Sequence, residues 1–166
     1  MRLEGSCHCG SVRFSLESEQ PWPYQRCYCS ICRKTGSGGY MINLGGDHRT
    51  LSVEGEEHLS VYRATITDPD APGGRRPSRH KRFFCGHCGS HLWAHNDRWP
   101  DLVHPVASAI DTELPAAPAH SHMMLGSKAS WVPVELGPDD ETFDEYPRTS
   151  LAAWHEEHGY RDSGSG

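Results

Sequence analysis

Seven cysteines in three short clusters are the residues best suited to chemistry in this chain. Cys7 and Cys9 form a C-x-C pair, and Cys85 and Cys88 form a C-x-x-C pair. Zinc binds four thiolates in a tetrahedron with Zn–S distances of about 2.3 Å, so the sulfur atoms must lie within about 4 Å of one another. Because residues two apart on a strand project from the same face, such short spacings allow both pairs to bind one ion. The two pairs predict a structural zinc site that joins distant parts of the chain.

The third cluster, C-x-C-x-x-C, consists of Cys27, Cys29 and Cys32, and no further cysteine remains to complete it. Structural zinc sites usually contain four protein ligands, whereas catalytic sites keep one position for water or substrate. Three thiolates therefore predict a catalytic zinc. Two alternatives stay open: a histidine can close the site, with the pair His120-x-His122 as the best candidate for a fourth ligand or a proton relay, or the two sites can exchange cysteines.

The composition indicates one compact domain of short strands and turns. The 166 residues are 36% hydrophobic and include 17 glycines and 12 prolines. With 16 basic and 22 acidic residues the net charge is −6, which argues against nucleic acid or a membrane as partner and favours a small molecule. The N-terminal residues lack the apolar stretch of a signal peptide, so we expect a cytoplasmic protein whose cysteines bind metal rather than form disulfides.

Short strands separated by Gly, Pro and Asp clusters are the main elements that the sequence predicts. Val12, Phe14 and Leu16 alternate with polar residues, a pattern typical of a strand with one buried face. Because the strand candidates follow one another closely along the chain, we expect antiparallel pairing. The other candidates are residues 40–44, 58–64, 81–85, 91–95 and 102–110.

The C-terminal region predicts one short helix, over residues 150–158. Thr149 or Ser150 can cap its start, and Gly159 can end it. Residues 68–79 contain three prolines and two glycines, which predicts a surface loop. Residues 161–166 are predicted to form a flexible tail.

The cysteine clusters and their flanking residues resemble the glutathione-dependent formaldehyde-activating enzyme family, which also contains centromere protein V. The matching segments are GSCHCGSVRF at residues 5–14, CYCSICRKTGS at 27–37 and FCGHCGSHL at 84–92, with weaker matches at 128–131 and 143–147. The resemblance implies an all-β fold of antiparallel sheets, a β-tent shared with a Rab-binding exchange chaperone, in a single zinc-binding domain over residues 3–160. It also implies two zinc ions per chain, a structural one at Cys7, Cys9, Cys85 and Cys88 and a catalytic one at Cys27, Cys29 and Cys32.

The activity that the resemblance implies is the condensation of glutathione with formaldehyde to S-hydroxymethylglutathione, a carbon–sulfur lyase reaction. This chemistry suits a three-thiolate zinc, because a free thiol with a pKa of about 8.5 is mostly protonated at neutral pH and metal binding removes its proton. The expected partners are a small thiol such as glutathione and an aldehyde. The residues after the third cluster are candidates for binding the carboxylates of the thiol: Arg33, Lys34, Thr35, Gly36 and Ser37.

Several other features allow two interpretations. A non-catalytic zinc module that binds a protein is the competing function, although three ligands and an open position favour chemistry, and an oligomer remains possible. His8 and His87 are either hydrogen-bond partners of the zinc ligands or spacers. We expect the five tryptophans to pack in the core or at its rim. A basic run forms either an anion-binding patch or a solvated loop: Arg75, Arg76, Arg79, Lys81 and Arg82.

Overall fold

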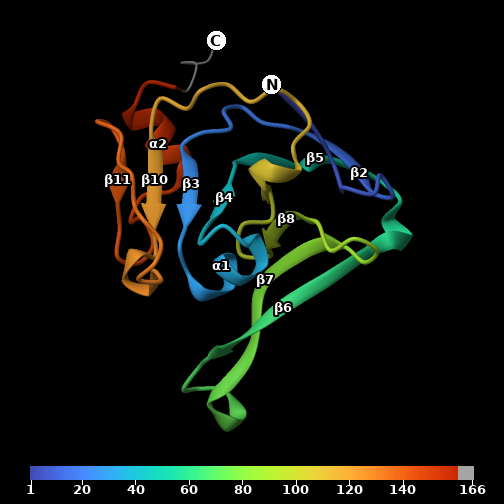
Figure 1. Ribbon diagram of the computed structural model, residues 1–166, viewed down its shortest axis with the longest axis horizontal. Helices are drawn as coiled ribbons and strands as arrows, with labels where there is room; N and C mark the ends of the chain where they lie inside the picture. The colour runs from blue at the N-terminus through green and yellow to red at the C-terminus, as the bar shows by residue number, and fades with distance from the viewer. Residues whose placement is uncertain (161–166) are drawn as a thin grey trace. The chain divides into compact units, whose positions relative to one another are not determined.

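The computed structural model describes residues 1–160, and the predicted tail at residues 161–166 lies outside the described residues. The described chain is mainly β, with strands β1 to β11 in two sheets and two short α-helices (Figure 1). The predicted all-β class is confirmed. No helix of residues 1–160 is long and apolar enough to cross a membrane.

The larger sheet has seven strands in the order β1-β2-β5-β9-β8-β7-β6. Each of its pairings is antiparallel, as the sequence predicts. Its strands in chain order are β1 (Arg2–Ser6), β2 (Arg13–Glu17), β5 (Gly46–Glu54), β6 (Leu59–Thr67), β7 (Arg75–Cys85), β8 (His91–Asn96) and β9 (Leu102–Pro105).

The smaller sheet has four strands in the order β11-β10-β3-β4 and contains parallel pairs. β10 pairs in parallel with both β3 and β11, which differs from the expected antiparallel pairing. A long connection separates β3 from β10 along the chain, and such a connection can return the chain in the same direction. The strands are β3 (Tyr24–Cys27), β4 (Met41–Asn43), β10 (His120–Met123) and β11 (Glu141–Thr142).

The chain divides into two compact units that alternate along the sequence. The first contains Met1–Glu19 and Ile42–Ala116, and the second contains Gln20–Met41 and Ala117–Gly166. The division reflects contacts within each unit. One domain over residues 3–160 therefore remains a prediction.

The predicted strand with one buried face is β2, the second strand from one edge of the larger sheet. Val12, Phe14 and Leu16 are 0%, 4% and 1% exposed. Phe14 packs against Trp93 of β8 with ring centroids 5.0 Å apart, and Phe83 of β7 stacks on the same indole at 5.2 Å. These contacts fix the strands that carry the first cysteine pair relative to those that carry the last.

Helix α2 (Leu151–Glu157) confirms the predicted C-terminal helix, whereas α1 (Ser30–Gly36) was not predicted. The Ser150 hydroxyl caps α2 by accepting a hydrogen bond from the Ala153 amide at 3.1 Å. The chain also contains 3₁₀ turns, of which η3 ends the segment predicted as a strand over residues 102–110. The turns are η1 (Glu56–His58), η2 (Pro72–Gly74), η3 (Ala107–Ala109) and η4 (Leu125–Ser127).

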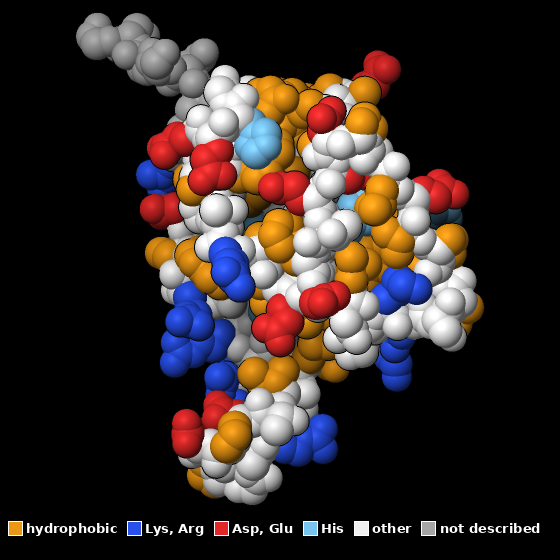
Figure 2. All heavy atoms as spheres, turned by 90° about the vertical axis from the view of Figure 1, so that its left-hand side faces the viewer, with side chains coloured by type: hydrophobic (Ala, Val, Ile, Leu, Met, Phe, Trp, Pro, Cys, Tyr) orange, Lys and Arg blue, Asp and Glu red, His pale blue; other side chains and the backbone are white. Residues whose placement is uncertain are grey.

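The prediction of a surface loop over residues 68–79 is wrong in its second half, because β7 already begins at Arg75. β6 and β7 form a long hairpin that turns at η2 (Figure 1). Residues 75–77 pair with residues 65–67 of β6 although Pro77 lies among them, and the register then shifts before Lys81 pairs with Arg63. Lys and Arg side chains lie around this hairpin, which forms the lower projection in Figure 2.

Candidate metal centres

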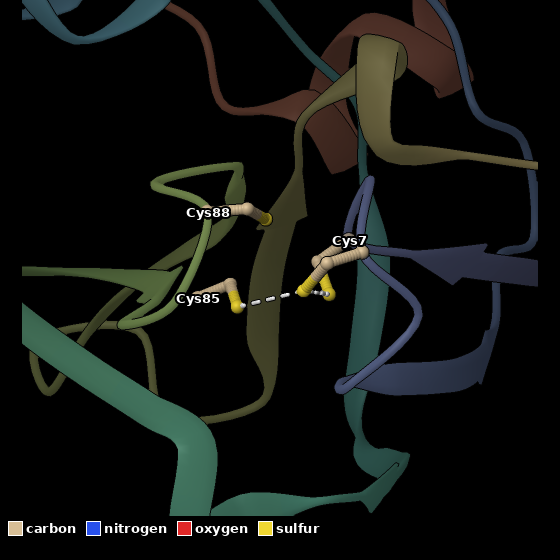
Figure 3. Close-up of side chains that lie close together, drawn as sticks. Cys7, Cys85 and Cys88 are labelled. Atoms are coloured by element: carbon tan, nitrogen blue, oxygen red, sulfur yellow. Dashed lines mark hydrogen bonds between the residues drawn. The ribbon is translucent and has the colours of Figure 1, made fainter.

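Four cysteines of the first unit converge as the sequence predicts. The ligand atoms of Cys7, Cys9, Cys85 and Cys88 all lie within 4.8 Å of one another, and Figure 3 shows the sulfur atoms of Cys85 and Cys88 turned toward that of Cys7. The Cys9 sulfur is 3.5 Å from that of Cys7 and 3.7 Å from that of Cys85. A tetrahedron with Zn–S bonds of about 2.3 Å has sulfur atoms about 3.8 Å apart. The cluster can therefore hold a metal ion whose bonds to sulfur are about 2.3 Å long.

Two similar turns present these four thiols. In the first, the Gly10 amide donates to the Cys7 carbonyl at 2.9 Å, and in the second the Gly89 amide donates to the Cys85 carbonyl at 2.8 Å. Both glycines have a φ of +76°, in the left-handed region that side chains disfavour. A glycine directly after each cysteine pair thus lets the chain turn tightly around the thiols.

The protein environment separates the proton affinities of the thiols in this cluster. Burial raises the pKa of Cys85 to about 11. Hydrogen bonds from the hydroxyl and amide of Ser90 lower the pKa of Cys88 to about 5, and the hydroxyl lies 3.2 Å from the sulfur. Hydrogen bonds from Ser11 likewise lower the pKa of Cys9. The two exposed thiols therefore lose their protons more readily than the buried Cys85 thiol.

The three remaining cysteines converge in the second unit. The ligand atoms of Cys27, Cys29 and Cys32 lie within 4.8 Å of one another, and all three residues are buried. Cys27 ends β3, Cys29 is the N-cap of α1, and Cys32 lies in the first turn of that helix. The strand-to-helix transition therefore brings three sequence neighbours to one point.

Two of the three thiols have pKa values shifted in opposite directions. Hydrogen bonds to the Cys29 and Cys32 thiols, with burial, raise the pKa of Cys27 above its usual range. Hydrogen bonds from the Cys27 and Cys32 thiols lower the pKa of Cys29, helped by the amides of Cys32 and Ile31. The Cys32 amide lies 3.4 Å from the Cys29 sulfur. The surroundings thus favour the thiolate form at Cys29 over that at Cys27.

The histidine pair considered as a source of a fourth ligand is engaged elsewhere. Nε2 of His122 lies 3.0 Å from Oδ2 of Asp140, and its Nδ1 lies 2.9 Å from the Tyr28 hydroxyl. Nδ1 of His120 lies 3.1 Å from Oδ1 of the same carboxylate. Among residues 1–160 the ligand group around Cys27 contains three cysteines alone. The described residues thus bring three thiols together at this cluster, and the histidine pair does not join them.

The candidate substrate-binding residues continue from the three-cysteine cluster through α1. Arg33 and Lys34 lie in the last helical turn, where Lys34 is exposed. The Thr35 hydroxyl donates to the Ile31 carbonyl at 2.9 Å, so it serves the helix itself. Gly36 packs against Met41, and Ser37 ends the helix with a φ of 60°. Binding of a carboxylate by Arg33 and Lys34 stays a prediction.

The two histidines inside the cysteine motifs lie differently. Nδ1 of His87 is 3.3 Å from the Ser11 hydroxyl, which is 3.3 Å from the Cys9 sulfur, so this side chain reaches the cluster through one residue. The side chain of His8 is exposed, and its amide donates to the Ser90 hydroxyl at 3.1 Å. Of the two, His87 fits the hydrogen-bonding interpretation and His8 fits that of a spacer.

A cavity borders the four-cysteine cluster and was not predicted. It has a volume of about 430 Å³ and is lined by Cys7, Ser90, His91 and Asp111, among others. Neither ring nitrogen of His91 has a hydrogen-bond partner among residues 1–160, and burial together with the Arg82 charge lowers its pKa to about 4. The imidazole is thus neutral near pH 7. No residue spacing in the sequence had indicated a role for His91.

The tryptophans and the basic run depart from the expectations. Trp93 and Trp154 are buried as expected, but Trp99 and Trp131 are 54% and 68% exposed. Arg76 pairs with Asp68, and Lys81 pairs with Asp97 at 2.9 Å. Arg82 is buried. The basic run lies on strand β7 rather than in a solvated loop, and an anion-binding patch there stays a prediction.

Comparison with known proteins decides the family. A sequence profile described as "Glutathione-dependent formaldehyde-activating enzyme" matches residues 2–126. The chain belongs to this family. A Halomonas elongata protein, whose name provisionally assigns it as a glutathione-dependent formaldehyde-activating enzyme, is 53% identical over 156 residues, which cover 93% of this chain and 95% of that protein. The predicted family membership is confirmed.

A solved structure supports the fold of this family member. A crystal structure of a Rhodobacter sphaeroides protein matches 69% of this chain and 92% of its own, with a TM-score of 0.51 and 25% sequence identity. The profile spans all three cysteine clusters and the candidate cations after the third. The two clusters that can hold metal thus both lie within the part of the chain that defines the family.

Proposed function

We propose that the protein is a zinc-dependent carbon–sulfur lyase that joins formaldehyde to a small thiol, glutathione or a close relative, at the three-cysteine cluster. The observation that carries this proposal is a group of three converging thiols with no fourth ligand among residues 1–160. Family membership supports the substrates, because glutathione and formaldehyde are named in the family's description. The three-cysteine cluster can bind a metal ion whatever the substrate is.

The four-cysteine cluster is proposed to hold a structural zinc. Its four thiols are enough to fill a tetrahedron, and the sulfur separations of 3.5 and 3.7 Å fit that geometry. Because four thiols fill the tetrahedron, the neighbouring cavity does not need to supply a further ligand. We therefore place the reaction at Cys27, Cys29 and Cys32.

In the three-cysteine cluster, zinc would deprotonate an incoming thiol and hold it as a thiolate. Hydrogen bonds from the Cys27 and Cys32 thiols, helped by the amides at the start of α1, already favour the thiolate form of Cys29, so the protein supplies a ligand prepared to bind metal. Arg33 and Lys34 orient the substrate through its carboxylates. When the thiolate sulfur attacks formaldehyde, a C–S bond forms, the carbonyl π bond opens, and the thiol proton ends on the new hydroxyl. The product is a hydroxymethyl thioether.

The proposal includes the setting of this chemistry. All seven cysteines are free thiols in the structure, a state that a reducing cytoplasm maintains. Residues 3–160 are proposed to act as one domain with two zinc ions. Small partners, a thiol and an aldehyde, suit the net charge of −6 better than nucleic acid does.

Exchange spectroscopy tests the proposed reaction. The proton signals of hydrated formaldehyde and of the hemithioacetal are followed with and without zinc-loaded protein, for glutathione, cysteine and other small thiols. We expect faster exchange with glutathione than with cysteine, because Arg33 and Lys34 provide two cations for the two carboxylates of the tripeptide. Exchange that no thiol accelerates would contradict a lyase and favour the non-catalytic zinc module.

A further inference from the structure

A chain of buried, hydrogen-bonded side chains starts between two cysteines of the three-cysteine cluster. Tyr28 separates Cys27 from Cys29, and its hydroxyl lies 2.9 Å from Nδ1 of His122. Nε2 of His122 lies 3.0 Å from Oδ2 of Asp140. Tyr28 is 1% exposed and His122 is 0% exposed, and the Asp140 side chain is 4% exposed. The chain of contacts is therefore shielded from water along its whole length.

The carboxylate at the far end sets the direction of every hydrogen bond. Burial opposes its ionisation, but the amides of Gly137 and His120 and the imidazoles of His122 and His120 lower the pKa of Asp140 below its usual range. An ionised carboxylate accepts, so Nε2 of His122 carries a proton. Burial lowers the pKa of His122 and so favours the neutral imidazole, whose Nδ1 then has a free lone pair. Tyr28 must then donate its hydroxyl hydrogen to that lone pair. In each of these side-chain hydrogen bonds, one group is therefore fixed as the donor and the other as the acceptor.

Main-chain pairing holds the same segment. The Tyr28 amide donates to the Met123 carbonyl at 3.0 Å, and Met123 lies opposite Cys27 in the parallel pairing of β10 with β3. Because side chains alternate along an extended chain, Tyr28 projects opposite to Cys27 and Cys29. The side-chain contacts therefore fix the cysteine segment from behind, while the thiols face the other way.

We propose that Tyr28, His122 and Asp140 are positioning residues that hold Cys27 and Cys29 in the geometry of metal ligands. A site with three protein ligands depends strongly on such support, and loss of a group that orients the ligands typically weakens metal binding about 10- to 100-fold. This inference rests on the metal site of the proposed function and not on the identity of the reaction.

Cadmium binding to whole protein variants tests the inference, because ¹¹³Cd resonances of a four-thiolate and a three-thiolate site are separate signals. Tyr28→Phe removes one hydroxyl, and Asp140→Asn removes the charge at the other end of the chain. We expect each variant to bind cadmium about 10- to 100-fold more weakly at the three-cysteine cluster, measured by competition with a chelator, and to shift that resonance alone. The four-cysteine resonance is the internal control.

Asp139→Asn is the matched control, since Asp139 is exposed and adjacent to Asp140, and it should leave both affinities unchanged. Unchanged affinity at the three-cysteine cluster in both test variants would overturn the inference, as would equal weakening at both sites. If Asp140→Asn fails to fold, Tyr28→Phe decides alone.

The same experiment separates this inference from the proposed function. Wild-type protein that binds cadmium at both clusters but does not accelerate thiol–formaldehyde exchange would contradict the lyase and leave the positioning role intact. Wild-type protein without a three-cysteine resonance would overturn both.

Discussion

Replacing Cys88 with serine should remove most of the stability of the protein, because Cys88 shares its proposed zinc with residues far away in the sequence. Cys88 is exposed, so exchanging sulfur for oxygen there should by itself change the free energy of unfolding by no more than about 0.5 kcal/mol. Any larger loss must come from the metal. Cys88→Ser therefore isolates the contribution of the ion better than a change at Cys85, which is 0% exposed.

The expected loss follows from what the site connects. It joins the turn between β1 and β2 to the turn between β7 and β8, and the Cys9 and Cys85 sulfur atoms are 3.7 Å apart. A structural zinc site can contribute on the order of 10 kcal/mol to folding. Since most domains are stable by only about 5–15 kcal/mol, Cys88→Ser should be largely unfolded at 25 °C.

Cys32→Ser is the comparison at the other cluster, because it also exchanges one sulfur for oxygen, here in a buried side chain. Its cluster lies within one strand-to-helix transition and closes no long loop. We expect this variant to remain folded and to lose one zinc. Thermal melting followed by circular dichroism, together with zinc content, measures both variants. A Cys88→Ser protein that melts within a few degrees of wild type, beside an unfolded Cys32→Ser protein, would show that the structural and catalytic sites are assigned the wrong way round.

Three further predictions follow from the sites and the backbone. Glutathione should change the thiolate-to-metal charge-transfer bands of the cobalt-substituted protein, whereas S-methylglutathione should not, and equal responses would show that the thiol does not reach the metal. His91 has a pKa of about 4 in the folded protein, whereas a histidine in the unfolded chain has a pKa of about 6.5. Between these pH values the unfolded state binds more protons, so the free energy of unfolding should fall as the pH decreases from 6.5 toward 4. His91→Asn should reduce the loss of unfolding free energy between pH 7.5 and 5 by about 2 kcal/mol in denaturant titrations, and an unchanged loss would refute a buried neutral imidazole. Gly39→Ala should cost about 1–3 kcal/mol in the same assay, because Gly39 has a φ of +89° and an added Cβ would lie 2.5 Å from Val132; a wild-type midpoint would contradict this.

The cysteine clusters were predictable because thiols have few roles in a reducing compartment and short spacings limit their geometry. The strand around Phe14 was equally clear, since a buried face alternates with an exposed one. Helix α1 was missed because seven residues are too few to show a helical period, although Cys29 as its N-cap explains why the helix starts there. The grouping of Cys27, Cys29 and Cys32 was thus predicted, but the helix that carries Cys32 was not.

The support behind the third cluster could not be read from the sequence. β3 and β10 are short, pair in parallel and lie far apart along the chain, so no local pattern brings Tyr28 to His122. The pair His120-x-His122 was noticed as a ligand or proton-relay candidate, but nothing in the sequence assigned Asp140 as its partner. Pairing across such a distance depends on the folded topology rather than on propensity.

The central claim is that thiol–formaldehyde chemistry takes place at the metal held by Cys27, Cys29 and Cys32. The most direct test compares the glutathione–formaldehyde exchange rate of zinc-loaded wild type with that of folded Cys32→Ser at equal protein concentration, with zinc content measured on the same samples. We expect wild type with two zinc ions to accelerate exchange and Cys32→Ser with one zinc ion to leave it at the uncatalysed rate. Equal acceleration by both proteins would contradict the claim and place the chemistry outside the three-cysteine cluster.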